Sequence, residues 1–185
     1  MISGSTTSEL RVDALNVTGA CAHGNVEASR QAVERFGFTG GRVLEPAAGI
    51  GHFLGAMPRA LAEHCAVTAV EIDQLSGRLL QTLYAPHGAD VRIAPFEKVA
   101  LPENWFDLVI GNPPYGRTTL SPAMRSTYAR SLYGHANLYG LFTDLALRWT
   151  RPGGVVAFVT PTSFLAGEYF KALRGVLSEE APPQA

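Results

Sequence analysis

The stretch "RVLEPAAGIGHFLG", residues 42–55, passes from an apolar strand pattern to a helical pattern through a turn that contains Gly49 and Gly51. Glycine at such a turn lets the backbone approach a ligand closely and adopt conformations that a Cβ would forbid. The spacing to the next glycine, Gly55, differs from the dinucleotide fingerprint G-x-G-x-x-G, which argues against a nicotinamide cofactor. The stretch therefore predicts the first strand, turn and helix of an α/β domain, with a ligand site at the turn.

The same alternation continues on both sides of this stretch. Further strands are predicted at 66–72, 89–94, 106–111 and 153–161, and helices before Gly37 and at 52–64, 73–84, 138–149 and 167–177. Strands that are nearly all apolar and alternate with helices indicate a mostly parallel sheet covered on both faces. We expect a doubly wound α/β domain, whose ligands bind at the carboxyl ends of the strands.

Length and composition limit the class of protein. The chain has 185 residues and 46% hydrophobic composition, enough for one domain with a core. We expect this domain to span residues 23–178, after a poorly ordered segment at 1–22 and before a disordered tail or cut linker at 179–185. The two cysteines form no CxxC, the histidines have no metal-ligand spacing, and neither a membrane span nor a signal peptide is evident. A cytoplasmic protein without a metal site is expected.

Two acidic residues end predicted strands near the glycine turn. Glu71 ends the second strand, at about the distance from the glycines at which an acid usually binds ribose hydroxyls. Glu45 either accepts hydrogen bonds from N–H groups of the loop or meets a cationic ligand. The sulfonium and ammonium groups of S-adenosylmethionine would suit an acidic pocket lined by glycine. Nothing resembles a Walker lysine, which argues against nucleoside triphosphates.

The corner "NPPY", residues 112–115, follows the apolar strand "FDLVIG". Asn112 offers a side-chain carbonyl, and Pro113 a backbone carbonyl whose direction is restricted by Pro114. Two such acceptors can hold both hydrogens of an –NH₂ group, while Tyr115 supplies a face for stacking. Hydrogen bonds from both hydrogens stabilise positive charge that develops on the nitrogen during methyl transfer. The corner therefore predicts methylation of a planar amine or amide nitrogen.

The charge distribution is uneven although the formal net charge is only −1. No acidic residue lies between Asp107 and Asp144, a window that contains Arg117, Arg125 and Arg130. These arginines are either a local basic surface for a phosphate-bearing substrate or an ordinary solvated face.

Five segments together resemble a known family. "RVLEPAAGIGHFLG", "AVEID", "FDLVIGNPPYG", "NLYGLF" and "RPGGVVAFVTPTSFL" occur in this order in the N6-adenine DNA methyltransferases of restriction–modification systems, the γ-type arrangement, and the resemblance covers roughly residues 38–178. It implies a Rossmann-like class I methyltransferase fold, S-adenosylmethionine as methyl donor, and an adenine flipped out of DNA as acceptor. The residues that it assigns to the donor are Glu45, Ala47, Gly49 and Gly51 for the methionine part, Glu71 for the ribose, and Ile72, Phe96 and Phe142 for the adenine. The target amine and base fall to Asn112, Pro113, Pro114 and Tyr115.

Three features depart from the family pattern. Pro95 stands where the family usually has an aspartate that reads the donor's adenine, and "GACAHGNVEAS" lacks the usual Thr-Pro pair. The family's sheet also continues with a final antiparallel strand pair and a region that reads DNA sequence. This chain stops after the helix near Leu177, so we expect an unpaired sheet edge. A complementing carboxyl-terminal or target-recognition polypeptide would be its partner.

Three hypotheses about function stay open at this point. The first is DNA adenine-N6 methylation, incomplete in this chain. The second is methylation of a protein glutamine amide or an RNA base amine at the same corner, although the arginines after Tyr115 favour a phosphate-bearing substrate. The third is a non-catalytic cofactor-binding remnant, or one subunit of a split enzyme.

Overall fold

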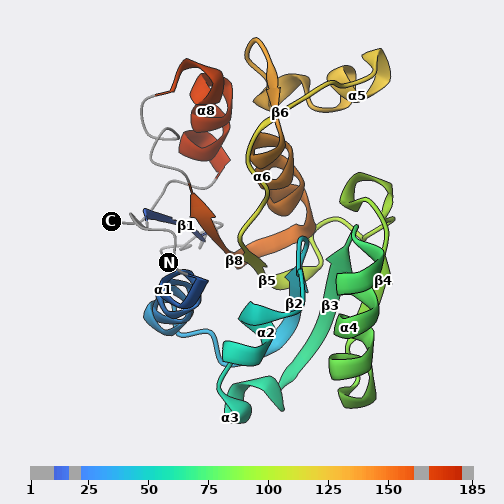
Figure 1. Ribbon diagram of the computed structural model, residues 1–185. Coiled ribbons are helices and arrows are strands. Elements are labelled where there is room, and N and C mark those ends of the chain that lie inside the picture. Colours follow the sequence, from blue (N-terminus) through green and yellow to red (C-terminus); the bar gives the residue numbers. More distant parts are fainter. Residues whose placement is uncertain (1–10, 17–21, 161–166, 181–185) are drawn as a thin grey trace, which may run out of the picture.

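A six-stranded sheet forms the centre of the computed structural model, which describes residues 11–16, 22–160 and 167–180 (Figure 1). The strand order is β1-β8-β5-β2-β3-β4, and every neighbouring pair runs parallel. The strands are β1 (Arg11–Asn16), β2 (Gly41–Glu45), β3 (Cys65–Glu71), β4 (Asp90–Ile93), β5 (Phe106–Gly111) and β8 (Thr150–Thr160). The chain runs outward from β2 to β4, returns to β5 beside β2, and continues to β8 on the other side. This reversal confirms the predicted doubly wound fold, and ligands of such sheets bind where the strand order reverses, which is here between β2 and β5.

Helices cover both faces of the sheet (Figure 1). Successive side chains of a strand point to opposite faces, so each central strand contributes to two apolar clusters. Leu44 and Val109 pack with helices α6 and α8, whereas Val43 and Leu108 pack with α1 and α2. The helices are α1 (Ala22–Arg35), α2 (His52–Ala56), α3 (Arg59–Ala62), α4 (Gln74–Tyr84), α5 (Pro122–Thr127), α6 (Leu138–Trp149) and α8 (Lys171–Glu180). Short 3-10 turns are η1 (Ala85–His87), η2 (Phe96–Lys98), η3 (Ala129–Ser131) and η4 (Glu168–Phe170).

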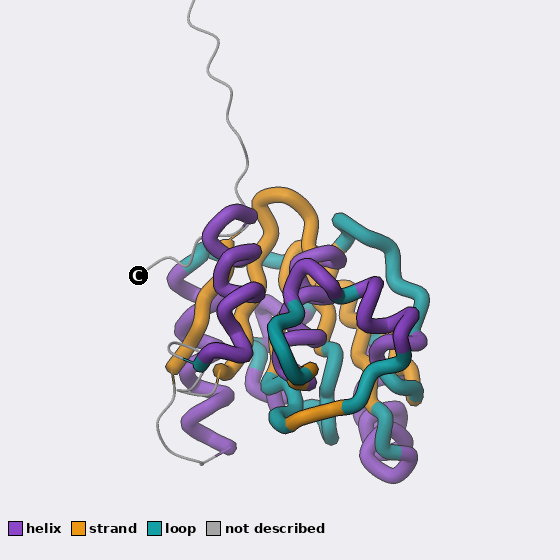
Figure 2. The backbone as a smooth tube through the Cα atoms, turned by 90° about the horizontal axis from the view of Figure 1, so that it is seen from above, coloured by secondary structure: helices purple, strands orange, loops and turns teal. Residues whose placement is uncertain are grey.

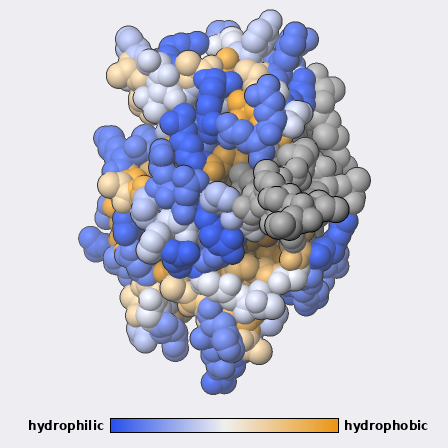
Figure 3. All heavy atoms as spheres, turned by 180° about the vertical axis from the view of Figure 1, so that it is seen from behind, coloured by the Kyte–Doolittle hydropathy of each residue, from blue (hydrophilic) through white to orange (hydrophobic). Residues whose placement is uncertain are grey.

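The surface is mostly hydrophilic on the face opposite to that of Figure 1, with smaller apolar patches between charged side chains (Figure 3). This is the surface of a domain whose apolar side chains are mainly used in its core. Within the described residues, no helix is both long and apolar enough to cross a membrane.

Most predicted elements occur close to their predicted positions. The helix expected at 138–149 is α6, and the strand "FDLVIG" is β5. The helix expected at 52–64 is instead divided into α2 and α3. Pro58 causes the division, since a residue that precedes proline avoids the helical region, and Met57 is extended with φ −65° and ψ 129°.

Within the segment 1–22, which was expected to be poorly ordered, the structure places Arg11–Asn16 in β1. This strand pairs in parallel with β8, from Arg11 opposite Val155 to Asn16 opposite Thr160. The unpaired edge expected beside β8 is therefore occupied, and the unsatisfied N–H and C=O groups of that edge find partners in β1. A short strand whose partner lies so far along the sequence gives no local signal.

The boundary expected at the other end also shifts. Residues 179 and 180, assigned to a disordered tail or cut linker, belong to α8. Glu180 makes an ion pair with Arg130, with 2.6 Å between Oε1 and Nη1. Residues 181–185 and 1–10 lie outside the described residues.

An arm leaves the carboxyl end of β5 and returns to the start of α6. It contains a two-stranded antiparallel sheet of β6 (Arg117–Thr118) and β7 (Ala136–Asn137), together with α5 and η3. The backbone N–H of Leu138 donates to the carbonyl of Gly116, which closes the base of the arm. The arm and α8 lie at the top of Figure 1, with α8 above β8, and Figure 2 views the molecule from this side.

Candidate active site at the carboxyl edge of the sheet

The glycine turn after β2 depends on two left-handed residues. Gly49 has φ 57° and Gly51 has φ 88°, a region that other residues adopt only at a cost. A Cβ at Gly51 would lie 2.4 Å from Cε2 of Tyr84, so this glycine is also required by packing. A Cβ at Gly49 would meet nothing within 4 Å, so its backbone borders open space. The turn thus has one side packed against α4 and one side accessible to a ligand.

Glu71 ties this turn to the end of β3. Its Oε2 accepts the N–H of Gly49 and its Oε1 accepts the N–H of Asp73, both at 2.7 Å. Each carboxylate oxygen has a second lone pair, so the side chain can still accept a ligand hydroxyl. Ile72 follows directly and is 66% exposed. An acid with acceptor capacity beside an exposed apolar side chain fits a ribose followed by an adenine.

Glu45 ends β2 and has a different environment. Its side chain is 1% exposed, and neither of its carboxyl oxygens has a hydrogen-bond partner. Burial, followed by the nearby charge of Glu71, raises the pKa of Glu45 well above its ordinary value, and the N–H of Leu54 opposes this only in part. Buried polar atoms are almost always hydrogen-bonded in native proteins, so this carboxyl has the character of a ligand-binding group.

The structure brings Phe96 and Phe142 together, the first from η2 and the second from α6. Their rings stack on each other, with 3.5 Å between centroids and 24° between planes, and both are buried. A ring-sized slot between them is therefore absent, and the pair forms a single apolar wall. Pro95, the residue before η2, has no acceptor side chain where the resemblance expects an acid.

The corner after β5 holds the four residues predicted to be catalytic. Pro113 is buried, Pro114 is exposed, and Tyr115 is 47% exposed. The Tyr115 hydroxyl donates to Oδ1 of Asn112 at 2.7 Å and lies 3.2 Å from the carbonyl oxygen of Val159. The proposed acceptor atom of Asn112 is thus engaged by the protein's own tyrosine. Burial raises the pKa of Tyr115, which keeps its hydroxyl a donor.

Two further aromatic residues lie behind Tyr115 that the sequence did not single out. The rings of Tyr115 and Tyr139 have centroids 6.3 Å apart, and Tyr139 meets the edge of Phe170 at 5.8 Å. Tyr139 is buried at the start of α6, and Phe170 lies in η4. Tyr139 lies within the motif "NLYGLF", but the sequence alone gives it no role at the corner. The contact with Phe170 depends on the packing of α6 against the segment that precedes α8.

The three arginines expected to meet phosphate differ in their surroundings. Arg130 pairs with the fully buried Asp144, with 2.5 Å between Nε and Oδ1, as well as with Glu180. Arg125 is exposed and donates to the carbonyl of Gly134 at 2.8 Å. Arg117 is exposed in β6. Arg130 therefore connects the arm to α6 and α8 through these ion pairs, while Arg117 and Arg125 lie on the surface of the arm.

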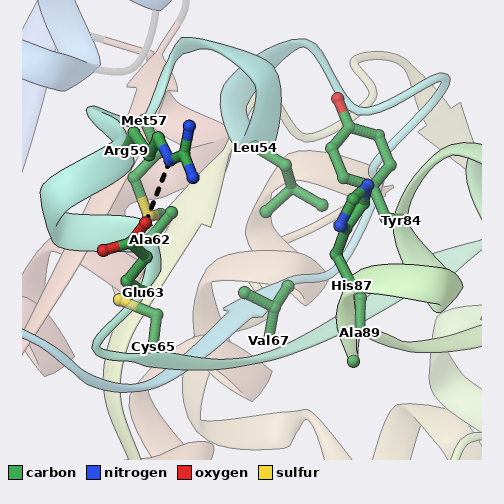
Figure 4. Close-up of a pocket in the computed structure, with 11 residues that line it drawn as sticks. Leu54, Met57, Arg59, Ala62, Glu63, Cys65, Val67, Tyr84, His87 and Ala89 are labelled. Atoms are coloured by element: carbon green, nitrogen blue, oxygen red, sulfur yellow. Dashed lines mark hydrogen bonds and ion pairs between the residues drawn. The ribbon is translucent and has the colours of Figure 1, made fainter.

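A cavity of about 580 Å³ lies away from this edge, between α2, α3 and α4. Leu54 and Val67 form its middle, with Tyr84 and His87 on one side and Met57 on the other (Figure 4). Its link to the glycine turn is Tyr84, whose hydroxyl donates to the carbonyl of Gly51 at 2.8 Å.

Comparison with curated proteins gives relatives among restriction–modification enzymes. The chain is 36% identical over 152 residues to a Type II methyltransferase of Thermus thermophilus, a match that covers 76% of this chain and 34% of that protein. Defense against restriction protein B of Escherichia phage P1 is 33% identical over 148 residues, 79% of this chain and 6% of that protein. The chain thus spans about a third, or less, of the length of these relatives.

Solved structures agree on the fold. The methyltransferase subunit of a type I restriction-modification system from Streptococcus thermophilus matches with a TM-score of 0.66 at 18% identity, over 94% of this chain and 40% of that chain. A protein of Listeria monocytogenes described as a class I S-adenosylmethionine-dependent methyltransferase matches with a TM-score of 0.64 at 18% identity, over 85% of this chain and 49% of that chain. The fold is that of the class I methyltransferases.

The family itself follows from the sequence. The model of the Eco57I restriction-modification methylases matches residues 72–182, which is more than half of the chain, begins directly after β3 and includes the corner after β5. The chain therefore belongs to the Eco57I restriction-modification methylase family.

Proposed function

We propose that this chain carries the centre for S-adenosylmethionine-dependent methyl transfer to the exocyclic N6 amine of adenine in DNA. The observation that carries the proposal is the adjacency of two strand ends. β2 and β5 pair directly, and a Cβ at Gly111 would lie 3.8 Å from Cγ of Glu45. The acidic, glycine-lined end of β2 thus borders the Asn112 corner, as transfer between two bound molecules requires.

The donor would be held by the ends of β2 and β3 and by the segment after β4. We assign its methionine part to Glu45, Ala47, Gly49 and Gly51, its ribose to Glu71, and its adenine to Ile72 and to the wall formed by Phe96 and Phe142. When bound, S-adenosylmethionine supplies an electrophilic methyl group. The fit is good for the cationic and ribose parts, because an unpartnered acid and a carboxylate with free lone pairs are present.

The acceptor would be held by the corner itself. Oδ1 of Asn112 and the carbonyl of Pro113 would accept the two hydrogens of the target amine, and Tyr115 would stack on the base. The Tyr115 hydroxyl occupies one of the two lone pairs of this Oδ1, so the amine competes with it for the acceptor. Because two neutral acceptors stabilise charge on the nitrogen, no side-chain base would be required before transfer. The bond from nitrogen to the methyl carbon would form as the bond from that carbon to sulfur breaks, S-adenosylhomocysteine would leave, and the surplus proton on the methylated nitrogen would pass to water.

DNA is the acceptor that the arm favours. Arg117 and Arg125 are exposed on an arm that begins directly at the corner, and no acidic residue lies between Asp107 and Asp144. Such a surface meets phosphates and positions a nucleic acid without reading its sequence. Because the relatives are much longer, we propose a further target-recognition polypeptide as the partner that reads the sequence.

A cofactor-binding subunit without turnover is the second candidate. Two specific observations favour it: the absence of an acceptor at Pro95 and the direct stacking of Phe96 on Phe142. Such a protein would bind the donor weakly and transfer no methyl group.

The test is transfer of labelled methyl groups from S-adenosylmethionine to unmethylated DNA, RNA and a protein extract in separate reactions. We expect label in DNA, recovered as N6-methyladenine after digestion, and a loss of about 100- to 1000-fold in Asn112→Ala, which removes one acceptor. Gln81→Ala, a change on the exposed side of α4, serves as the matched control. Label in protein alone would overturn the DNA proposal, and donor binding without any transfer would support the second candidate.

A further inference from the structure

Glu45 stands apart from every other buried side chain that the structure describes. Its two carboxyl oxygens are the only buried side-chain oxygen or nitrogen atoms in the described ranges without a hydrogen-bond partner. An ionised carboxylate in such a position loses its hydration and gains nothing in return. A neutral, protonated carboxyl avoids most of this cost.

The groups around Glu45 do not supply a compensating positive charge. Glu71, on the next strand, is an acid that already accepts two backbone N–H groups. Burial, followed by the nearby Glu45, raises the pKa of Tyr84 in α4, and the Tyr84 hydroxyl donates to the carbonyl of Gly51. From α2, the N–H of Leu54 is directed toward Glu45 without reaching hydrogen-bond geometry. Among the described residues, the elements packed against Glu45 thus leave it without a cation.

We propose that Glu45 holds a proton while the methyl donor is absent, and that the cationic donor displaces this proton when it binds. The inference rests on the proposed function, in which this edge binds S-adenosylmethionine. The O–H bond of the Glu45 carboxyl breaks, the proton passes to the buffer, and the carboxylate that remains pairs with the ammonium or sulfonium group of the donor. Burial, which makes a lone carboxylate costly, makes this new ion pair strong.

The consequence is that donor binding depends on pH in a defined direction. The pKa of Glu45 is raised in the donor-free protein, and a bound cation lowers it. Between these two values, binding releases up to one proton per donor, and the association constant rises by up to about tenfold per pH unit. Above the donor-free pKa the contribution of Glu45 to this dependence disappears, since Glu45 is then already ionised.

Isothermal titration calorimetry tests the proposal directly. S-adenosylmethionine would be titrated into the protein from pH 5.5 to pH 8.5 in buffers of different ionisation enthalpy, so that the buffer dependence of the heat gives the number of protons released. We expect a release that approaches one proton for the unsubstituted protein and none for Glu45→Gln. Glu97→Gln, which removes an exposed acid, is expected to keep the release.

Two analogues identify the cation that Glu45 meets. S-adenosylhomocysteine keeps the ammonium group and lacks the sulfonium, whereas 5′-methylthioadenosine lacks both. Proton release with S-adenosylhomocysteine assigns the ammonium, release with S-adenosylmethionine alone assigns the sulfonium, and 5′-methylthioadenosine should bind without release.

An infrared difference spectrum keeps the proposal testable if Glu45→Gln does not fold. Addition of S-adenosylmethionine to the unsubstituted protein should remove the C=O band of a protonated carboxyl. Donor binding without proton release at any pH, and without loss of this band, would overturn the inference and leave the proposed function standing. Failure of the donor to bind at any pH would instead overturn the proposed function itself.

Discussion

The candidate site has a donor half, at the ends of β2 and β3, and an acceptor half, the corner at residues 112–115. The two halves differ in whether their polar atoms already have hydrogen-bond partners. At the end of β2, Glu45 is left without a partner, while in the acceptor half the carbonyl of Asn112 is already hydrogen-bonded to Tyr115. The donor half therefore gains an interaction when it is filled, whereas the acceptor half exchanges one interaction for another. This difference favours a site that binds the donor readily and accepts a base only when stacking on Tyr115 adds to the exchange.

The largest effect is expected from Asn112→Ala, which removes the acceptor and leaves the donor half intact. Methyl transfer should fall by about 100- to 1000-fold, because one of two groups that stabilise charge on the nitrogen is lost. Calorimetry should give an unchanged dissociation constant for S-adenosylmethionine. A donor affinity that falls together with the rate would show that the two halves are not separable.

The glycine turn provides the next test, through a matched pair of substitutions. Gly51→Ala places a Cβ 2.4 Å from Tyr84 at a φ of 88°, and should lower the free energy of unfolding by about 3 kcal/mol. Gly49→Ala carries only the cost of its backbone conformation, about 1 kcal/mol, because nothing lies within 4 Å of the new Cβ. Urea unfolding of both variants measures the difference. Equal losses would contradict the packing of the turn against α4.

Tyr115→Phe sharpens the comparison in the acceptor half. The variant keeps the stacking ring but removes the hydroxyl that engages Asn112, an interaction worth about 1 kcal/mol. We expect up to about fivefold tighter binding of an adenine-containing DNA in a fluorescence titration, since the amine no longer competes with the hydroxyl. Weaker binding than in the unsubstituted protein would mean that the hydroxyl itself holds the substrate.

The smallest effect concerns stability in the absence of donor. The pKa of Glu45 lies above its ordinary value of 4.5, so the folded protein keeps a proton that the unfolded chain releases, and stability falls as pH rises through this window. Glu45→Gln lacks this titration, so its stability relative to the unsubstituted protein should increase from acidic to neutral pH. Unfolding free energies measured in urea at several pH values check the sign. A constant difference would indicate that Glu45 titrates normally.

The sequence predicts the central part of the fold well, because the inner strands are apolar and helices such as α4 and α6 begin at a polar cap, Asp73 or Asn137. It fails where the decisive contact is distant. β1 lies at the edge and pairs with a strand near the other end of the chain. From the sequence, Arg130 could be an ordinary solvated cation, because its ion pairs with Asp144 and Glu180 form only in the folded chain. Pro58, by contrast, is a local signal that could have divided the helix at 52–64.

Much of the candidate site is likewise predictable as a set of residues but not as a geometry. The spacing of motifs brings Phe96 and Phe142 together, yet only packing decides that the rings touch each other. Packing likewise decides that the Tyr115 hydroxyl donates to Asn112 and does not face solvent. Whether Glu45 has a hydrogen-bond partner depends on the positions of all the residues around it, so it cannot be predicted from a sequence pattern.

The pairing of β1 has a consequence for how the chain folds during synthesis. Arg11 is opposite Val155, so the two partners are separated by about 140 residues of chain, and β1 leaves the ribosome long before β8 exists. Contacts between residues so far apart form late, because a long loop has to close first. The first strand of this sheet to be made is thus among the last to find its place in it. Until then β8 is a free edge, so a nascent or amino-terminally shortened chain is the form most exposed to strand pairing between molecules.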